Sequence, residues 1–156
     1  MVAKTRLPAI SACHCFVLRR AARRLTQFYD EMLAPTSLRI SQFSLLALVY
    51  ELGAPTMNEI AELIELDRTT AGKNLQPLER AGLITTSRST QDGRVRVARL
   101  TEKGRTTLKE ACVLWRSAQR HYEQANGHTT VAEFERGLIS FRIPRLRKRA
   151  PVGALT

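Results

Sequence analysis

Apolar residues recur at spacings of three and four along most of the chain, which is typical of amphipathic helices. This pattern predicts a first helix over residues 11–34, stopped by Pro35, and a second that begins with Ser41 as its N-cap and ends at Gly53. The second helix is apolar on more than one face, so we expect it to be the most buried element.

Two further helices are predicted by their capping residues. Thr56 and Glu59 form a capping-box pattern that opens a short helix, and Asp67 is a suitable N-cap for a helix over residues 68–81. Pro77 lies inside the second of these and has no backbone N–H group. We therefore expect one lost hydrogen bond and a kink in its second half.

The periodicity then changes from that of a helix to that of a strand. Residues 83–88 and 95–100 alternate apolar and polar positions around an Asp92-Gly93 turn signal, which predicts a β-hairpin. The order helix, short helix, turn, helix and hairpin is that of a winged helix-turn-helix. We therefore predict a mainly α fold with a small β-hairpin as its wing.

The C-terminal part of the chain is predicted to be helical. Thr101 is expected to cap a long helix that Gly127 breaks. A second capping box, formed by Thr130 with Glu133, opens a last helix. Residues 142–156 contain two prolines and five basic residues, which predicts a flexible tail.

Projection of the helix over 68–81 at about 100° per residue separates two faces. One sector contains the polar and basic side chains Thr69, Thr70, Lys73, Gln76 and Arg80. The opposite sector contains Ala71, Leu75 and Leu78. Short polar and cationic side chains opposite a buried face suit a helix that docks in the major groove of DNA, although an ordinary surface helix shows the same pattern.

The hairpin favours the DNA-binding interpretation over the ordinary surface helix. Its basic residues are Arg88, Arg94, Arg96 and Arg99, with only Asp92 to oppose them. Arg94, just after the turn, is placed to enter a minor groove, where narrow A·T-rich geometry concentrates negative potential. A cationic hairpin tip directly after a helix-turn-helix therefore predicts a nucleic-acid interface.

Composition agrees with a polyanionic partner but shows an uneven distribution of charge. The 156 residues include 25 Lys and Arg against 14 Asp and Glu, a formal net charge of +11. Residues 1–24 hold six basic and no acidic side chains, so that this segment and the tail carry most of the excess. Within 68–101, seven basic residues oppose two acidic ones, whereas 56–67 carries a charge of −4. The predicted DNA-reading element is thus polarised rather than basic throughout.

No segment indicates a membrane partner or an exported protein. The sequence lacks a run of about 18 apolar residues, and its first residues are not followed by the apolar core of a signal peptide. Cys13, Cys15 and Cys112 are too few, and odd in number, for a disulfide scaffold. These features predict a cytoplasmic protein with reduced thiols.

Four short motifs follow one another around the predicted helix and hairpin. They are Asp67-Arg68-Thr69-Thr70, Ala81-Gly82-Leu83-Ile84, Asp92-Gly93-Arg94 and Leu100-Thr101-Glu102-Lys103-Gly104. In order and spacing these motifs resemble the MarR family of transcription regulators, over roughly residues 15–122. The resemblance implies a homodimer that binds a palindromic double-stranded DNA operator, most often as a repressor. In that family the N- and C-terminal helices interlock to form the dimerisation region.

The same resemblance implies which side chains read the DNA. The first half of the reading helix lies in the major groove, which implies contacts from Thr69, Thr70, Lys73 and Asn74. Arg94 corresponds to the wing-tip arginine, and Asp92 to the residue that orients a neighbouring arginine. With the helical projection and the basic hairpin, the candidate DNA-binding residues are Arg68, Thr69, Thr70, Lys73, Asn74, Gln76, Arg88, Arg94 and Arg96.

The terminal helices carry large apolar side chains that no sheet covers. They include Phe16, Leu18, Trp115, Tyr122, Phe134, Leu138 and Phe141. A second copy of the chain is the simplest partner for these side chains, and a compact monomer with the helices folded back is the alternative.

Members of the family respond to a small-molecule effector or to oxidation of a cysteine. Cys15, with the residues that follow it, resembles the reactive cysteine of the organic-hydroperoxide-sensing subgroup, and Tyr29 lies at the position of a tyrosine that hydrogen-bonds that cysteine. Cys112 is a candidate to resolve an oxidised Cys15 as a disulfide, across the dimer. Arg19 departs from the subgroup, which has another tyrosine at that position.

Packing and metal binding are the alternatives for these cysteines. Free cysteines pack readily in helix interfaces. Cys13, His14 and Cys15 are too close together to surround a tetrahedral ion unaided, so a metal would also need Cys112 or His121. We predict neither a metal nor a cofactor.

An enzyme is not predicted either. The sequence lacks a glycine-rich phosphate loop, a nucleophile elbow, and a pair of carboxylates with a histidine at catalytic spacing. Two other functions remain as alternatives. One is a thiol-based redox protein that uses Cys15 and Cys112, and the other is a non-specific nucleic-acid-binding protein, suggested by charge alone.

These predictions divide the chain into five segments. They are a flexible start over 1–10, N-terminal helices for dimerisation and core over 11–55, a winged helix-turn-helix lobe over 56–101, C-terminal dimerisation helices over 102–141 and a basic tail over 142–156.

Overall fold

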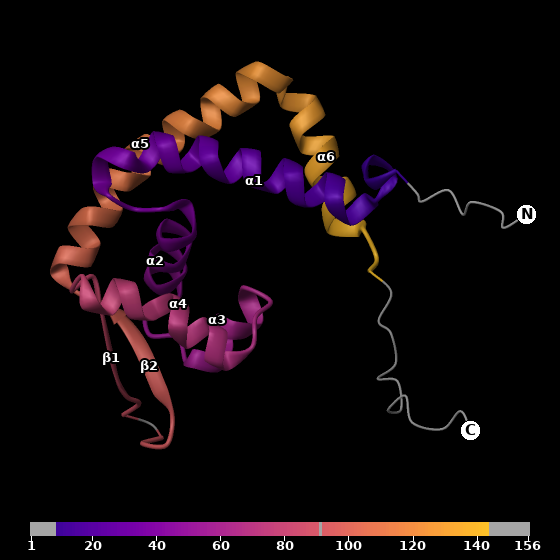
Figure 1. The fold of residues 1–156 in the computed structure, drawn as a ribbon. Coiled ribbons are helices and arrows are strands. Elements are labelled where there is room, and N and C mark those ends of the chain that lie inside the picture. Colours follow the sequence, from indigo (N-terminus) through magenta and orange to yellow (C-terminus); the bar gives the residue numbers. More distant parts are fainter. Residues whose placement is uncertain (1–8, 91, 144–156) are drawn as a thin grey trace, which may run out of the picture. The chain divides into compact units, whose positions relative to one another are not determined.

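The computed structural model describes residues 9–90 and 92–143 (Figure 1). The elements, in chain order, are η1 (Ile10–Ala12), α1 (His14–Leu33), η2 (Ala34–Thr36), α2 (Ile40–Leu52), α3 (Met57–Leu63), α4 (Arg68–Arg80), β1 (Ile84–Arg88), β2 (Arg96–Leu100), α5 (Glu102–Asn126) and α6 (His128–Ser140). The chain divides between Gln119 and Arg120 into two compact units. The predicted flexible start and basic tail lie mostly outside the described residues.

The element order confirms the predicted mainly α fold with one β-hairpin. In the first unit, α3 packs against α4, and α2 packs against both α4 and β2 (Figure 1). The hairpin extends from the α4 side of this group. Within the described residues, no single helix is long and apolar enough to cross a membrane, and α1 with α2 meets that test only as a pair bent by 71°.

Local capping bonds start three of the helices as predicted. At the start of α3, the Thr56 hydroxyl accepts the Glu59 N–H at 3.1 Å and the Glu59 carboxylate accepts the Thr56 N–H at 2.7 Å. At the start of α4, the Asp67 carboxylate accepts the Thr70 N–H at 3.0 Å. The Thr101 hydroxyl accepts an N–H of the first turn of α5 at 2.9 Å. These bonds satisfy N–H groups that a helix leaves unpaired in its first turn.

The start of α2 differs from the prediction, because Ser41 is not its N-cap. The helix begins at Ile40, whose N–H donates to the Asp30 carboxylate at 2.7 Å. One residue earlier, the Arg39 N–H donates to the Gln42 side chain at 2.9 Å. A carboxylate near the end of α1 therefore takes the role that the sequence pattern assigned to Ser41.

The start of α6 also differs from the prediction, because Thr130 does not open it. The helix begins at His128, and Gly127 is its N-cap with a φ of 82°. The Gly127 N–H also donates to the Glu123 carbonyl at 2.8 Å, which ends α5. Since glycine adopts positive φ without a steric penalty, this single residue ends one helix and begins the next, and Thr130 falls inside the first turn.

The core surrounds α2, which has four buried residues of 13 and is the most buried of the helices, whereas β2 is the most buried element, with three of its five residues buried. Fully buried side chains from the helices and the hairpin include Leu33, Leu46, Val49, Ile60, Leu75, Leu78 and Ile84. On α5, the ring of Trp115 stacks on that of Phe43, with centroids 5.8 Å apart and an interplanar angle of 23°. The ring of Trp115, predicted to need a second copy of the chain, is therefore already partly covered by the core of its own chain.

The two strands of the hairpin are antiparallel and pair in register from Ile84 with Leu100 to Arg88 with Arg96. The sequence pattern did not predict a third segment at this sheet. Val97 forms a bridge with Thr56, and the Ala98 N–H donates to the Pro55 carbonyl at 2.9 Å. The hairpin is therefore tied by backbone bonds to the residues just before α3.

The first turn of α5 is fixed to the turn between α4 and β1. The Thr101 hydroxyl donates to the Gly82 carbonyl at 2.7 Å, and the Lys103 ammonium donates to the Ala81 carbonyl at 2.8 Å. Gly104 lies so close to Leu83 that a Cβ atom would come within 2.9 Å of the Leu83 carbonyl carbon. Only glycine fits this approach, which gives the Leu100-to-Gly104 motif a structural role.

Candidate nucleic-acid interface

The outward face of α4 carries most of the predicted helix contacts. Ala71, Leu75 and Leu78 are at most 2% exposed and hold the opposite face in the core. The exposed residues of the helix include Arg68, Thr69, Lys73, Asn74 and Gln76. The structure thus confirms the two faces that the helical projection separated.

Thr70 differs from the other predicted contacts on α4. It is half-buried, and its hydroxyl donates to the Asp67 carboxylate at 2.6 Å. These bonds from Thr70 to Asp67 hold the pKa of that carboxyl below its ordinary value. The hydroxyl hydrogen of Thr70 is therefore engaged in the N-cap, which leaves its oxygen and methyl group as the groups nearest to any ligand.

A groove of about 590 Å³ runs between the outward face of α4 and the base of the hairpin. Five of the nine predicted DNA-binding residues line it, namely Arg68, Thr69, Lys73, Gln76 and Arg96. Thr70, Asn74, Arg88 and Arg94 are not part of the lining. The structure thus brings the central helix contacts and one wing arginine together, and leaves the wing tip as a separate contact.

Asp92 holds the backbone just before β2 by two hydrogen bonds. Its carboxylate accepts the Arg94 N–H at 2.9 Å, and its carbonyl accepts the Val95 N–H at 2.9 Å. Asp92 therefore shapes the backbone that carries Arg94. The Arg94 guanidinium is exposed and forms no ion pair with the part of the chain that the structure describes, so its charge is available to a ligand.

Like charges face one another across the hairpin. Arg88 lies directly opposite Arg96 in the strand register, and both are exposed. Directly opposed like charges destabilise a hairpin, whereas both charges would attract a polyanion that binds over them. The arrangement suits a phosphate-bearing partner.

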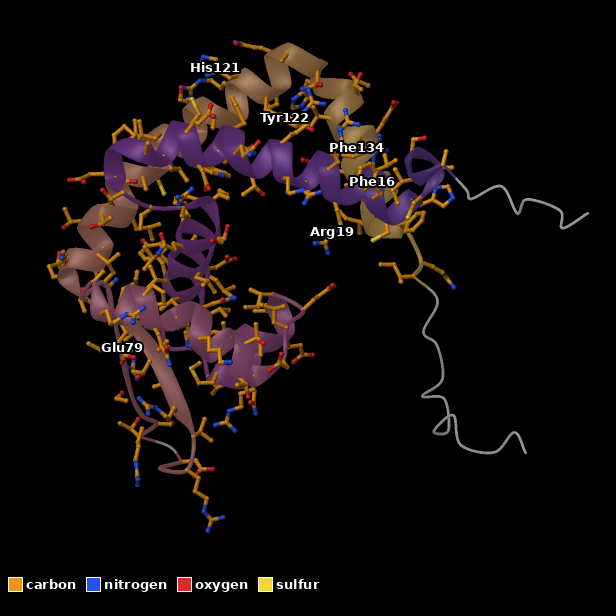
Figure 2. The ribbon with its side chains drawn as sticks, in the orientation of Figure 1. Phe16, Arg19, Glu79, His121, Tyr122 and Phe134 are labelled. Atoms are coloured by element: carbon orange, nitrogen blue, oxygen red, sulfur yellow. The ribbon has the colours of Figure 1, made fainter. Side chains whose placement is uncertain are left out.

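Sequence reasoning missed two residues of this surface, Glu79 and Thr86. The Thr86 hydroxyl donates to the Glu79 carboxylate at 2.6 Å, and the Thr86 N–H donates to the same oxygen at 3.2 Å. The Arg96 guanidinium in turn donates to the Thr86 hydroxyl oxygen. Figure 2 labels Glu79 where α4 meets the hairpin. A signal was present, because Glu79 is the only acidic residue of the helix over 68–81.

The cysteine candidates lie apart from this surface. Cys13 and Cys15 are exposed at the start of α1, and Cys112 is half-buried on α5. The Tyr29 hydroxyl donates to the Gln119 side chain. Fourteen residues of continuous helix, about 21 Å, separate Cys15 from Tyr29, so they cannot bond to one another within one chain.

The cysteines do not gather with other ligand side chains in the part of the chain that the structure describes. Among residues 9–90 and 92–143, no group of three or more His, Cys, Asp or Glu side chains is placed to hold an ion. Cys112 instead lines a groove of about 580 Å³ between α2 and α5, with apolar Leu108 and Val113 and the basic side chains Arg105, Lys109 and Arg116.

Comparison with known proteins identifies the family. The MarR family model matches residues 38–95. An organic hydroperoxide resistance transcriptional regulator of Bacillus subtilis is 34% identical over 99 residues, which are 64% of this chain and 67% of that protein.

Solved structures agree over a longer stretch. The Mycobacterium tuberculosis regulator MosR in complex with DNA is 35% identical, with a TM-score of 0.68 over 84% of this chain and 99% of that one. The transcriptional repressor CouR bound to a 23-mer DNA duplex is 27% identical, with a TM-score of 0.76 over 86% of this chain and 98% of that one. The family and these neighbours are transcriptional regulators, which confirms that the chain is not an enzyme. The winged helix-turn-helix, its cationic face and these relatives together show that this chain belongs to the MarR family of DNA-binding transcriptional regulators.

Proposed function

We propose that two copies of this chain bind a palindromic double-stranded operator and repress transcription from it. In each copy α4 lies in the major groove and the wing tip enters the adjacent minor groove. The observation that carries the proposal is the joint surface of α4 and hairpin, where Arg68, Lys73 and Arg96 line one groove and Arg94 projects separately from the tip.

A homodimer is supported by apolar surface on the outer helices. Leu18 on α1 is 44% exposed, and Phe134, Leu138 and Phe141 near the C-terminal end are 46–63% exposed. Side chains of this size are stabilised when a second surface removes them from water. A two-fold axis would also present two reading helices about one duplex turn apart, which matches a palindrome.

We place the protein in the cytoplasm. Its release from DNA is proposed to follow one of two signals, oxidation of a cysteine or binding of an effector. Cys15 is exposed, and one relative is a regulator of organic hydroperoxide resistance. In the oxidation route, the Cys15 thiolate attacks the O–O bond of a hydroperoxide and becomes a sulfenic acid, while the hydroperoxide leaves as an alcohol after taking a proton. In the effector route, the groove beside Cys112 takes an apolar molecule with an acidic group, which is favoured because three basic side chains line the groove against one acidic one, Glu51.

The decisive test compares two arginines of the wing. Arg94→Ala is expected to weaken binding to a specific palindrome about 10-fold or more, because it removes an exposed positive charge at the tip. Arg99→Ala, on the same hairpin but on the other face of β2 from Arg96, is the matched control and should change affinity little. The measurement is fluorescence anisotropy with an operator duplex recovered by footprinting upstream of the protein's own gene. Equal losses in the two variants would instead support non-specific polyanion binding.

The release signals are tested in the same footprint. Protection that disappears with an organic hydroperoxide and returns with a dithiol reductant supports oxidation, and Cys15→Ser should abolish that response. Protection that is unchanged by hydroperoxide would rule out the oxidation route.

A further inference from the structure

A chain of hydrogen bonds joins three elements at the base of the wing. The Arg96 guanidinium on β2 donates to the Thr86 hydroxyl oxygen on β1, and that hydroxyl donates its own hydrogen to the Glu79 carboxylate on α4. The Thr86 N–H donates to the same carboxylate oxygen, so Glu79 holds Thr86 by two bonds. The side chain of Arg96 is therefore linked to the reading helix through one hydroxyl group.

The strand register explains why these side chains meet. Thr86 pairs with Ala98, and Arg96 lies two residues before Ala98 on the same strand. Residues two apart on a strand share a face, so Thr86 and Arg96 are diagonal neighbours on one face of the hairpin. Glu79, Thr86 and Arg96 all line the groove that also contains Lys73.

A carboxylate on this face is unfavourable for DNA binding by itself. Glu79 is exposed on the helix that faces the polyanion, and it would repel phosphate. It also offers Arg96 a competing partner, because arginine–carboxylate pairs are strong and often bidentate. Among the described residues Glu79 and Arg96 form no direct ion pair, and the Thr86 hydroxyl instead forms hydrogen bonds with both.

We propose that Thr86 and Glu79 are positioning residues that hold the Arg96 guanidinium in the groove for contact with a DNA phosphate beside the reading helix. This role rests on the proposed function, and it gives a function to Thr86 and Glu79, which are not among the predicted DNA-binding residues. Without the Thr86 hydroxyl, Arg96 is repelled by Arg88 opposite it and turns to Glu79, which neutralises its charge and withdraws it from the phosphate.

The test measures operator affinity across a range of salt concentrations for a small set of variants. Thr86→Val keeps the β-branched shape and removes the hydroxyl, Thr86→Ser keeps the hydroxyl, and Arg96→Ala removes the cation. The probes are the footprinted operator duplex and a scrambled duplex of the same length and composition. Thermal unfolding of each variant reports whether it is folded.

The proposal expects Arg96→Ala to lose about 10-fold in affinity and to lower the salt slope by about one phosphate contact. Thr86→Val should lose about 3- to 10-fold with a similar change in slope, and Thr86→Ser should bind like wild type. The double variant Thr86→Val/Arg96→Ala should bind no worse than Arg96→Ala alone, because Thr86 acts through Arg96. Adding Glu79→Gln to Thr86→Val should recover part of the affinity, since the competing carboxylate is gone.

The outcomes separate this role from the function it rests on. A wild-type protein that does not prefer the operator over the scrambled duplex would overturn the proposed function, and this role with it. Selective wild-type binding with an unchanged affinity and slope in Thr86→Val would overturn the positioning role alone. Losses that add in the double variant would also overturn it, because they would show that Thr86 acts independently of Arg96.

Discussion

Apolar side chains are buried in the reading lobe, the winged helix-turn-helix over residues 56–101, and exposed on the C-terminal helix α6. In α4 the three apolar side chains Ala71, Leu75 and Leu78 are at most 2% exposed. In α6, Leu138 and Ile139 are 46% and 86% exposed, and Val131 is the one buried residue of that helix. The apolar face of α4 is therefore covered within one chain, whereas α6 leaves apolar side chains exposed in the single chain.

The same contrast recurs along α1. Its last turns contribute Tyr29 and Leu33 to the buried residues, while Val17 and Leu18 nearer its start are 52% and 44% exposed. One helix thus belongs to the core at its end and presents apolar surface at its beginning. Apolar residues at helical spacing show that a face is buried, but they do not show whether the cover is the same chain or another one.

The largest expected effect comes from truncating one leucine in each region. Leu75→Ala in α4 should lower the free energy of unfolding by about 2–5 kcal/mol, because the side chain is 2% exposed and leaves a cavity. Leu138→Ala in α6, at 46% exposed, should change that free energy far less at low protein concentration. Urea unfolding followed by circular dichroism measures both.

A second measurement on this pair sharpens the comparison. If α6 lies in a dimer interface, Leu138→Ala should weaken self-association in sedimentation equilibrium, whereas Leu75→Ala should act on unfolding. Equal loss of unfolding free energy in both variants at low concentration would contradict the contrast, because it would mean that α6 is covered within a single chain.

Substitutions at two glycines should change the free energy of unfolding by smaller amounts and in opposite directions. Gly104→Ala should lower the free energy of unfolding by about 1–3 kcal/mol, because the new Cβ would collide with the backbone at Leu83. Gly137→Ala in α6 meets nothing within 4 Å and should raise that free energy by about 0.5–1 kcal/mol through helix propensity. Differential scanning calorimetry measures the two shifts. A stabilised Gly104→Ala protein would show that the junction of α5 with the reading lobe is loose.

Features set by neighbours in sequence could be predicted, because their chemistry acts within one turn. The cap at Asp67, the capping box at Thr56 and the hairpin around Asp92 all belong to this class, and all are confirmed. The outward face of α4 followed from helical periodicity in the same way. Ser41 and Thr130 show the limit, since a carboxylate from another helix and a positive-φ glycine took their places.

The candidate site was predicted less completely than the fold. Individual contacts such as Lys73 and Arg96 came from residue type and face, but the groove that joins them depends on how the hairpin packs beside α4. The bonds among Glu79, Thr86 and Arg96 connect residues seven and ten positions apart on three elements. No local pattern encodes such a contact, because it exists only once the strand register is set.

The smallest expected effect is a dependence on pH that acts through the carboxylates at the starts of α3 and α4. Hydrogen bonds from Thr56 hold the pKa of Glu59 below its ordinary value, and those from Thr70 do the same for Asp67. Because the folded pKa is depressed in each case, the stabilisation is present above the unfolded pKa, about 4, and is lost as the pH falls through the folded pKa. The start of α6 has no side-chain cap, so no capping carboxylate contributes to pH dependence there.

Backbone amide chemical shifts followed by NMR between pH 6 and about pH 2.5 would separate the two regions. The amides of Thr56 and Thr70 should titrate with the carboxylates of Glu59 and Asp67, which accept their hydrogen bonds, whereas the Val131 amide donates to the Gly127 carbonyl at 3.1 Å and has no capping carboxylate to follow. Asp67→Asn is the matched control, since asparagine is also a good N-cap and does not ionise in this range. A Thr70 amide that still titrates in Asp67→Asn would show that acid acts on the start of α4 through some other group, and the difference between the reading lobe and α6 would then need a cause other than their caps.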